Sequence, residues 1–336
     1  RFNLLTLCTN NQDVKFDADI DKKTKALKGS ARTEHARSVV TKIWNASRFL
    51  LMNMDGYTPG EPVAETAADA WMFSRLAKAT RMVTEGIEKY TFGEMARGVQ
   101  NFFWNEVCDW YVEVTKTRLK DDAARLQAQR NLIFVLDTSL RIMHPLMPFV
   151  TEEIWQSLPH EGASIMVSDW PQYSDALNFS AEEEQMNMIM DAVRAIRNRR
   201  AEMNVPHSKR AKIYISTSYV DTFRLSGEFM QKLAGASEVE VEDGIEIDGA
   251  VCIVTDAAKI YIPMGDLVDF EAERARLNKE LASAQKQLDG INAKLSNENF
   301  VSKAPAPVVE AQREAARKLN EKIAMLNDSL SKIANA

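Results

Sequence analysis

Glycine, cysteine and long apolar runs are all scarce in this sequence. Only 13 of its 336 residues are Gly, about 4% where ~7% is usual, while 45% are hydrophobic, and this balance predicts a helix-rich globular protein. No apolar run approaches the ~18 residues that span a bilayer, and no basic-then-apolar signal pattern opens the chain. We therefore expect a protein that is neither membrane-embedded nor exported.

The few cysteines also restrict the chemistry. Cys8, Cys108 and Cys252 are odd in number and stand in no metal-ligand spacing, which argues against a disulfide framework and against a zinc module. A reducing cytoplasm fits this cysteine usage best. Because the sequence starts at Arg1 rather than Met and is apolar from Phe2 onward, we expect a fragment of a longer protein.

Charge is distributed unevenly along the chain. The totals of 42 Lys and Arg against 48 Asp and Glu give −6, which argues against a generic polyanion binder. Residues 22–48, however, hold eight basic residues against Glu34 alone, and residues 194–212 hold seven against Glu202 alone. Two local basic stretches therefore interrupt an acidic protein.

Apolar periodicity predicts an antiparallel helical bundle in the first half of the chain. Expected helices cover 32–54, 63–89, 91–119 and 122–143, with a short one after Pro148 and another over 180–203. The helix over 91–119 carries so many large apolar residues that we expect it at the centre of the bundle. Thr91 with Glu94, and Ser180 with Glu183, have the spacing of capping boxes.

The pattern of residue types changes twice after residue 170. Short β-branched runs at 212–216, 239–241, 251–254 and 259–262, with a helix over 218–234, predict a small α/β module. Apolar residues then alternate by three and four from Leu267 to Leu295, and again from Val309 to Ile333. Since Pro305 and Pro307 separate these two legs, we expect an antiparallel coiled-coil hairpin about 43 Å long. The fold class is therefore mainly α: a helical bundle, a small α/β module and a coiled-coil hairpin.

Signatures of catalysis are missing. The four histidines have no partners at metal spacing, and Gly93 and Gly98 lack the Gly-Lys-Ser/Thr ending of a phosphate-binding loop. We expect no catalytic residue and no metal site on this chain.

One basic constellation lies on the first long helix. Lys42, Asn45 and Phe49 share one helical face, with Arg48 on its flank. Spacing alone favours a solvated face with Phe49 turned to the core. The alternative is a nucleic-acid face, in which cations bind phosphate, the amide reads a base edge and the ring stacks on an unpaired base.

Two other charged surfaces leave similar alternatives open. The 194–212 stretch is either a solvated surface or a site for an anionic partner. The arm from 267 to 336 holds 11 basic and 10 acidic residues, so its surface alone is typical of a solvated zipper.

Five segments together resemble the C-terminal half of the bacterial valyl-tRNA synthetase family, a branch of the class I aminoacyl-tRNA synthetases. They are KIWNASRFLLMNM (42–54), FFWNEVCDWYVEVTK (102–116), HPLMPFVTEEIWQ (144–156), IRNRRAEMNVP (196–206) and KLSNENFVSKAP (294–305). The resemblance implies four parts: the end of a catalytic domain (1–25), a helical anticodon-binding domain (26–170), a small α/β linker module (171–264) and a coiled-coil tRNA-binding arm (265–336). The two ATP-site signatures of class I enzymes are absent, so adenylation, with its ATP and magnesium, is expected on a domain that this chain lacks.

The resemblance also implies a partner, the tRNA for valine, and gives the basic constellation a role. Residues matching Lys42, Asn45, Arg48 and Phe49 are implied to contact the anticodon loop. The arm is implied to brace the outer corner of the tRNA, with phosphate-facing candidates Arg276, Lys279, Lys286, Arg313, Arg317 and Lys318. The rival interpretations are a structural protein that dimerises through its coiled coil and a free-standing enzyme with a disguised site. The hairpin favours a monomer over the zipper.

Overall fold

The computed structural model describes residues 1–9, 18–267, 270–296 and 306–334, which divide into two compact units. Residues 1–194 and 219–233 form the first unit, and residues 195–218 and 234–336 the second. Helix α8 (Ser180–Glu202) runs through the boundary in the sequence. No helix of the described part is long and apolar enough to cross a membrane.

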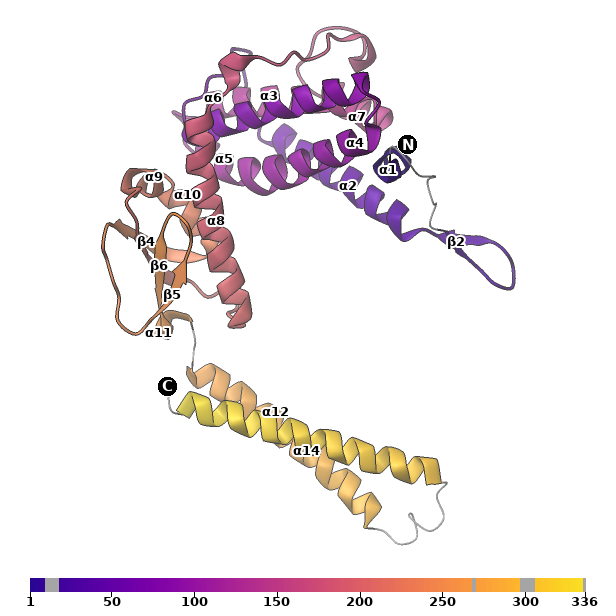
Figure 1. Cartoon of the computed structure of the whole chain (residues 1–336), viewed down its shortest axis with the longest axis vertical. Coiled ribbons are helices and arrows are strands. Elements are labelled where there is room, and N and C mark those ends of the chain that lie inside the picture. The colour runs from indigo at the N-terminus through magenta and orange to yellow at the C-terminus, as the bar shows by residue number, and fades with distance from the viewer. Residues whose placement is uncertain (10–17, 268–269, 297–305, 335–336) are drawn as a thin grey trace. The chain divides into compact units, whose positions relative to one another are not determined.

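The first unit is a helical bundle, as the sequence predicts (Figure 1). Its long helices are α2 (Ala31–Met52), α3 (Ala67–Glu88) and α6 (Arg125–Met143). Shorter elements are α1 (Phe2–Leu7), α4 (Phe92–Asn101), α5 (Val112–Arg118), α7 (Pro148–Trp155), α9 (Val220–Leu225), α10 (Gly227–Ala234), the 3-10 turns η2 (Ile165–Val167) and η3 (Asp175–Leu177), and the strands β1 (Asp19–Ile20) and β2 (Leu27–Gly29).

The predicted helix over 91–119 is interrupted by a π-helix. Between α4 and α5, the ten residues of η1 (Phe102–Tyr111) form a π-helix, whose hydrogen bonds close from residue i to i+5. Each turn of η1 therefore holds more residues than an α-helical turn, and side chains four or five residues apart lie toward one face. A helix with an α-helical apolar period gives no sequence signal for this change.

The centre of the core is shared between α3 and η1. Helix α3 buries side chains on all sides, including Trp71, Met72 and Leu76, each at most 1% exposed. Buried Asp69 on α3 accepts a hydrogen bond from Tyr111 of η1 (2.7 Å) and from Arg118 of α5 (2.6 Å). One carboxylate thus ties three elements together.

Helix ends follow the sequence only in part. Helix α6 ends before His144-Pro145, as proline dictates. The expected capping box of Thr91 and Glu94 is wrong, because Thr91 is the N-cap but makes no side-chain cap bond. The capping box lies instead at Thr66 and Asp69, at the start of α3. Glu183 does not cap α8 either, because its carboxylate binds Ser74 and Lys78 of α3.

The second unit holds a four-stranded sheet and the arm. The strands β3 (Ala211–Ser216), β4 (Ala236–Glu242), β5 (Ala250–Val254) and β6 (Lys259–Pro263) have the order β4-β3-β6-β5. Only the β3–β4 pair is parallel, and its connection runs through α9 and α10. Buried side chains alternate along β3, where Ile213 and Ile215 point into the core, whereas β6 buries Ile260, Tyr261 and Ile262 in succession.

After α11 (Met264–Leu267), helices α12 (Phe270–Leu295) and α14 (Ala306–Ala334) lie side by side as an antiparallel hairpin (Figure 1). Ala284 and Leu288 of α12 and Val309 and Ala316 of α14 are buried in its seam. Pro305 lies outside the described residues. Pro307 falls in the first turn of α14, where a missing backbone N–H does no harm. The mainly α fold class is confirmed.

Candidate nucleic-acid interface

Helix α2 has one buried face and one exposed stripe. Val39, Ile43 and Leu50 are at most 3% exposed and pack into the bundle. On the opposite side a stripe of exposed side chains recurs at helical spacing: Arg37, Thr41, Trp44, Asn45, Arg48 and Met52. We call these six residues the α2 stripe.

The four predicted contact residues of α2 do not have equal access to solvent. Asn45 and Arg48 are exposed members of the α2 stripe, and neither has a hydrogen-bond or ion-pair partner among the described residues. Lys42 and Phe49 are partly buried at the edge of the stripe. The structure thus brings all four onto one side of α2, with two of them free and two engaged.

Lys42 is held by η1. Its Nζ lies 2.6 Å from Oδ1 of Asp109 and 4.0 Å from the centre of the Trp104 ring. The side chain is only 24% exposed, whereas that of Asp109 is 48% exposed. Burial raises the pKa of the neighbouring Cys108 thiol to about 12, so this cysteine adds no charge beside the pair.

Phe49 satisfies neither sequence interpretation completely. It is half-buried rather than in the core, and Lys116 of α5 places its Nζ 5.1 Å from the ring centre. Lys116 also pairs with Glu113. The ring is therefore partly accessible, with a cation over one of its faces.

Sequence reasoning missed four residues of this surface. Trp44 is 46% exposed and Met52 is 72% exposed, although both are large and apolar. The available signal was the position of Trp44 among the polar residues of α2. Trp104 and Asp109 join the surface through their contacts with Lys42, more than 60 residues away in the sequence, and no local pattern indicates that.

The first part of the 22–48 basic stretch lies in the turn and second strand of the β1–β2 hairpin. Asp21 accepts backbone hydrogen bonds from Thr24 and Lys23 and pairs with Lys28 at 3.1 Å. The hydrogen bond from the Thr24 amide, then that from Lys28, lower the pKa of Asp21 to about 2. Lys22, Lys23 and Lys25 remain exposed on the turn.

In the 194–212 stretch much of the positive charge serves the fold. Arg200 is 7% exposed and donates to the carbonyls of Gly235 (3.3 Å), Pro206 (3.5 Å) and Lys209. Lys212 pairs with Glu238 (3.2 Å) and Glu240 (2.9 Å) on β4. These internal partners account for Arg200 and Lys212 without an anionic ligand.

The candidate residues of the arm are exposed on both helices. Lys279 and Lys286 lie on α12, while Arg313, Arg317 and Lys318 lie on α14. Arg276 is in α12, but its side chain lies outside the described residues. On α14, Arg313 pairs with Glu310 and Arg317 with Glu314, each at 2.8 Å. The α14 cations therefore carry partners one turn away.

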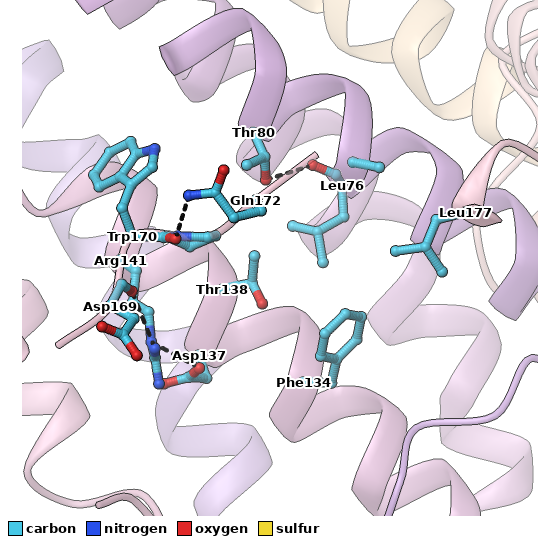
Figure 2. A pocket seen from close by; sticks show the side chains of 12 residues that line it. Leu76, Thr80, Phe134, Asp137, Thr138, Arg141, Asp169, Trp170, Gln172 and Leu177 are labelled. Atoms are coloured by element: carbon cyan, nitrogen blue, oxygen red, sulfur yellow. Dashed lines mark hydrogen bonds and ion pairs between the residues drawn. The ribbon is translucent and has the colours of Figure 1, made fainter. Parts of the chain in front are cut away.

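A cavity of about 320 Å³ lies between α3, α6 and residues 169–177 (Figure 2). Arg141 lies 3.0 Å from Asp137 and donates to the Asp169 carbonyl, and Gln172 donates to the Trp170 carbonyl. Of these contacts, the bond from Arg141 to Asp169 joins the 169–177 segment to α6. Among the described residues, no group of three His, Cys, Asp or Glu side chains could hold a metal ion.

Comparison with known families matches two parts of the chain. Residues 69–215 match the anticodon-binding domain of tRNA ligases, and residues 269–334 match the valyl-tRNA synthetase tRNA-binding arm. Helix α2 precedes the first matched range and packs on η1, which lies inside it.

Curated relatives match almost the whole chain. A valine–tRNA ligase of Carboxydothermus hydrogenoformans is 40% identical over 94% of this chain, and that of Geobacillus stearothermophilus is 39% identical over 96%. The valine–tRNA ligase of Thermotoga maritima is 38% identical over 98%. The chain spans only 35% to 36% of the length of these relatives. The two family matches and these identities show that the chain is similar, over almost its whole length, to the C-terminal part of the valyl-tRNA synthetase family.

Proposed function

We propose that this chain is the tRNA-recognition part of a cytoplasmic valine–tRNA ligase, which attaches valine to its tRNA using ATP. The bundle binds the anticodon stem-loop through α2, and the arm binds the outer corner of the tRNA. The observation that carries this proposal is the α2 stripe, where Arg48 and Asn45 stand free beside exposed Trp44. A cation, an amide and aromatic rings on one face are the groups that bind an unpaired RNA loop.

Within this proposal the predicted residues divide by role. Arg48 binds phosphate, Asn45 reads a base edge, Phe49 stacks on a base, and Lys42 supports the same surface. On the arm, the phosphate-facing residues are Arg276, Lys279, Lys286, Arg313, Arg317 and Lys318. Residues 1–25 are the end of the catalytic domain, 26–170 the anticodon-binding domain, 171–264 the linker module and 265–336 the arm.

The chemistry of aminoacylation lies elsewhere in the whole enzyme. In this proposal ATP and magnesium are used by a catalytic domain outside this chain. The chain alone binds tRNA as a monomer and does not form the aminoacyl ester.

A titration of the chain with two tRNAs tests the proposal. One is the unmodified tRNA for valine, and the other differs from it only in the anticodon. We expect the first to bind more tightly at every salt concentration, because base contacts do not depend on counterion release. Equal affinities throughout would leave only nonspecific electrostatics and would refute anticodon recognition.

The competing function is a coiled-coil interaction module that binds no RNA. The buried seam between α12 and α14 argues against this function, because Leu288 and Val309 are already buried by contacts within one chain. Sedimentation at high concentration separates the two, because an intermolecular zipper gives a concentration-dependent dimer and an intramolecular hairpin a monomer.

A further inference from the structure

Lys42 is not a free cation. Its ammonium group lies 2.6 Å from Asp109 and 4.0 Å from the Trp104 ring centre, and it is less exposed than the carboxylate that it binds. A lysine that is already paired releases few counterions when RNA binds. The group that this contact leaves more open to solvent is the Asp109 carboxylate.

The π-helical geometry of η1 places Asp109 at this surface. Because η1 closes its hydrogen bonds from i to i+5, Trp104 and Asp109 lie on the same face, and Lys42 of α2 contacts both. The opposite face of η1 points to α3, where Glu106 forms two hydrogen bonds with Arg75 (2.7 and 2.9 Å). The two carboxylates of η1 thus have different surroundings, and only that of Asp109 lies beside the predicted contact residues.

The two oxygens of Asp109 are also unlike each other. Oδ1 accepts from Lys42, whereas no described residue donates to Oδ2. A carboxylate accepts about four hydrogen bonds and donates none. The Asp109 side chain is 48% exposed, and Lys42, which binds it, lies on the same turn of α2 as Asn45. Oδ2 can therefore accept a hydrogen bond from a ligand at the α2 stripe.

We propose that Asp109 is a base-reading residue, which accepts a hydrogen bond from the exocyclic amino group of an unpaired base, and that Lys42 is its positioning residue. The proposal rests on the proposed function and names its recognition chemistry. Cytosine, adenine and guanine carry such an amino group, whereas uracil presents the O4 carbonyl. A carboxylate therefore accepts from the amino group of the first three bases, whereas it repels the O4 oxygen that uracil carries. Lys42 neutralises the carboxylate, so the negative charge does not repel the phosphates nearby.

The substitution Asp109→Asn tests this with a reversal of preference. Since an ammonium group only donates, Lys42 holds the amide oxygen of the new side chain and turns its NH2 group outward. That NH2 group can donate a hydrogen bond to uracil O4, whereas it cannot accept one from the amino group of cytosine, adenine or guanine. Affinities of wild type and variant are measured for the tRNA for valine and for three versions, each with one anticodon base changed to uracil or, where it is uracil, to cytosine.

We expect wild type to disfavour uracil at one anticodon position by about tenfold or more, and Asp109→Asn to lose or reverse that ratio at the same position only. In the double variant Lys42→Met with Asp109→Asn the amide is free to turn, so neither base is preferred. The control is Glu85→Gln on α3, which removes an equally exposed carboxylate paired with Lys89 at 2.8 Å and should change no ratio.

Two outcomes would overturn the inference. If Asp109→Asn lowers affinity for all four tRNAs by the same factor, Asp109 only ties α2 to η1. If it changes no affinity, Asp109 does not contact RNA. Failure of the proposed function looks different, because wild type itself would then show no dependence on any anticodon base.

Discussion

Arg48 and Lys42, six residues apart on α2, should contribute differently to binding. Arg48 is exposed and has no partner in the described part of the chain, whereas Lys42 is paired with Asp109. We expect Arg48→Ala to lower the slope of log affinity against log salt by about one unit, the effect of one lost phosphate contact. Lys42→Ala should lower it by clearly less.

Filter binding or fluorescence anisotropy over a range of salt concentrations gives both slopes. Equal reductions for the two variants would show that the Lys42–Asp109 pair opens when RNA binds.

Phe49→Ala should weaken tRNA binding by about 1 to 3 kcal/mol, the usual loss when a base loses its aromatic platform. The half-buried ring leaves little core to lose, so the fold should survive. Affinity and the circular dichroism melting curve are measured on the same preparation. A clearly lowered melting temperature with unchanged affinity per folded molecule would identify Phe49 as a packing residue.

The candidate site was predictable only as far as helical spacing reaches. The period of α2 places Lys42, Asn45 and Phe49 on one side, and the structure agrees. Spacing does not reveal that Lys42 is paired, because Asp109 is 67 residues away and is brought to α2 by tertiary packing. The place of Trp44 among the polar residues of α2 did indicate its exposure, but residue type alone predicts the opposite, since a tryptophan is ordinarily expected to turn inward.

At the scale of elements, Glu183 of α8 is the clearest source of pH dependence. It binds Lys78 and Ser74 of α3 and lies 3.7 Å from Arg75. Burial acts to raise the pKa of Glu183, but the hydrogen bonds from Lys78 and Ser74 outweigh it, and the pKa falls below its ordinary value of 4.5. A carboxyl with a lowered pKa in the folded state stabilises the fold above its unfolded pKa.

Glu183→Gln should therefore lower the free energy of unfolding at pH 7, by about 1–2 kcal/mol. This figure is below that of a fully buried pair, because the side chains of Lys78 and Arg75 are 38% and 35% exposed and water screens them. The difference from wild type should begin to shrink as pH falls below about 4.5, the ordinary pKa that Glu183 has in the unfolded chain, and should be lost as pH passes below its lower folded pKa. Urea unfolding at several pH values measures the free energy of unfolding of both proteins. If their difference does not depend on pH, the substitution acts through packing and not through the charge of Glu183.

The elements themselves were predicted more completely than their ends. Proline set the end of α6 correctly because its effect on the preceding residue is local. The capping box at Ser180 failed because Glu183 finds Ser74 and Lys78 on α3, and buried partners outweigh one exposed backbone amide. The π-helix escaped prediction because its apolar residues also satisfy an α-helical pattern.

For the whole molecule, the two helices of the arm should contribute unequally. Lys279 and Lys286 are exposed on α12, whereas Arg313 and Arg317 on α14 already pair with Glu310 and Glu314. Replacing both α12 lysines with glutamine should reduce the salt slope of tRNA binding by about two units. Replacing both α14 arginines should reduce it by less, because their own glutamates already neutralise them.

Deleting residues 267–336 removes the whole arm, so its effect on tRNA binding is the largest that substitutions on the arm can have. Overall affinity should fall, because one of two linked contacts is lost, while the anticodon preference stays. The preference is measured as the affinity ratio of the two tRNAs that differ in the anticodon. Equal affinity and equal salt slope for the truncated and full chains would show that the arm does not touch RNA.

The architecture of the arm was accessible from sequence because its seam depends on one repeated contact. Alternation by three and four predicted both legs, and buried Ala284, Leu288, Val309 and Ala316 lie in that seam. The surface of the same helices was not assignable to a function, because exposed charges serve solvation and RNA binding equally well.

The π-helix η1 gives the bundle a tolerance for change in chain length. One residue removed between Phe102 and Tyr111 can be absorbed when a π turn reverts to an α turn, so that the flanking helices α4 and α5 keep their places. A deletion elsewhere in a buried helix would turn every later side chain by about 100°. Removing Asn105, for instance, would leave a folded bundle in which Trp104 and Asp109 stand four residues apart instead of five. Because residues four apart in an α-helical turn also share a face, the surface that holds Trp104 and Asp109 can survive this change in length together with the fold.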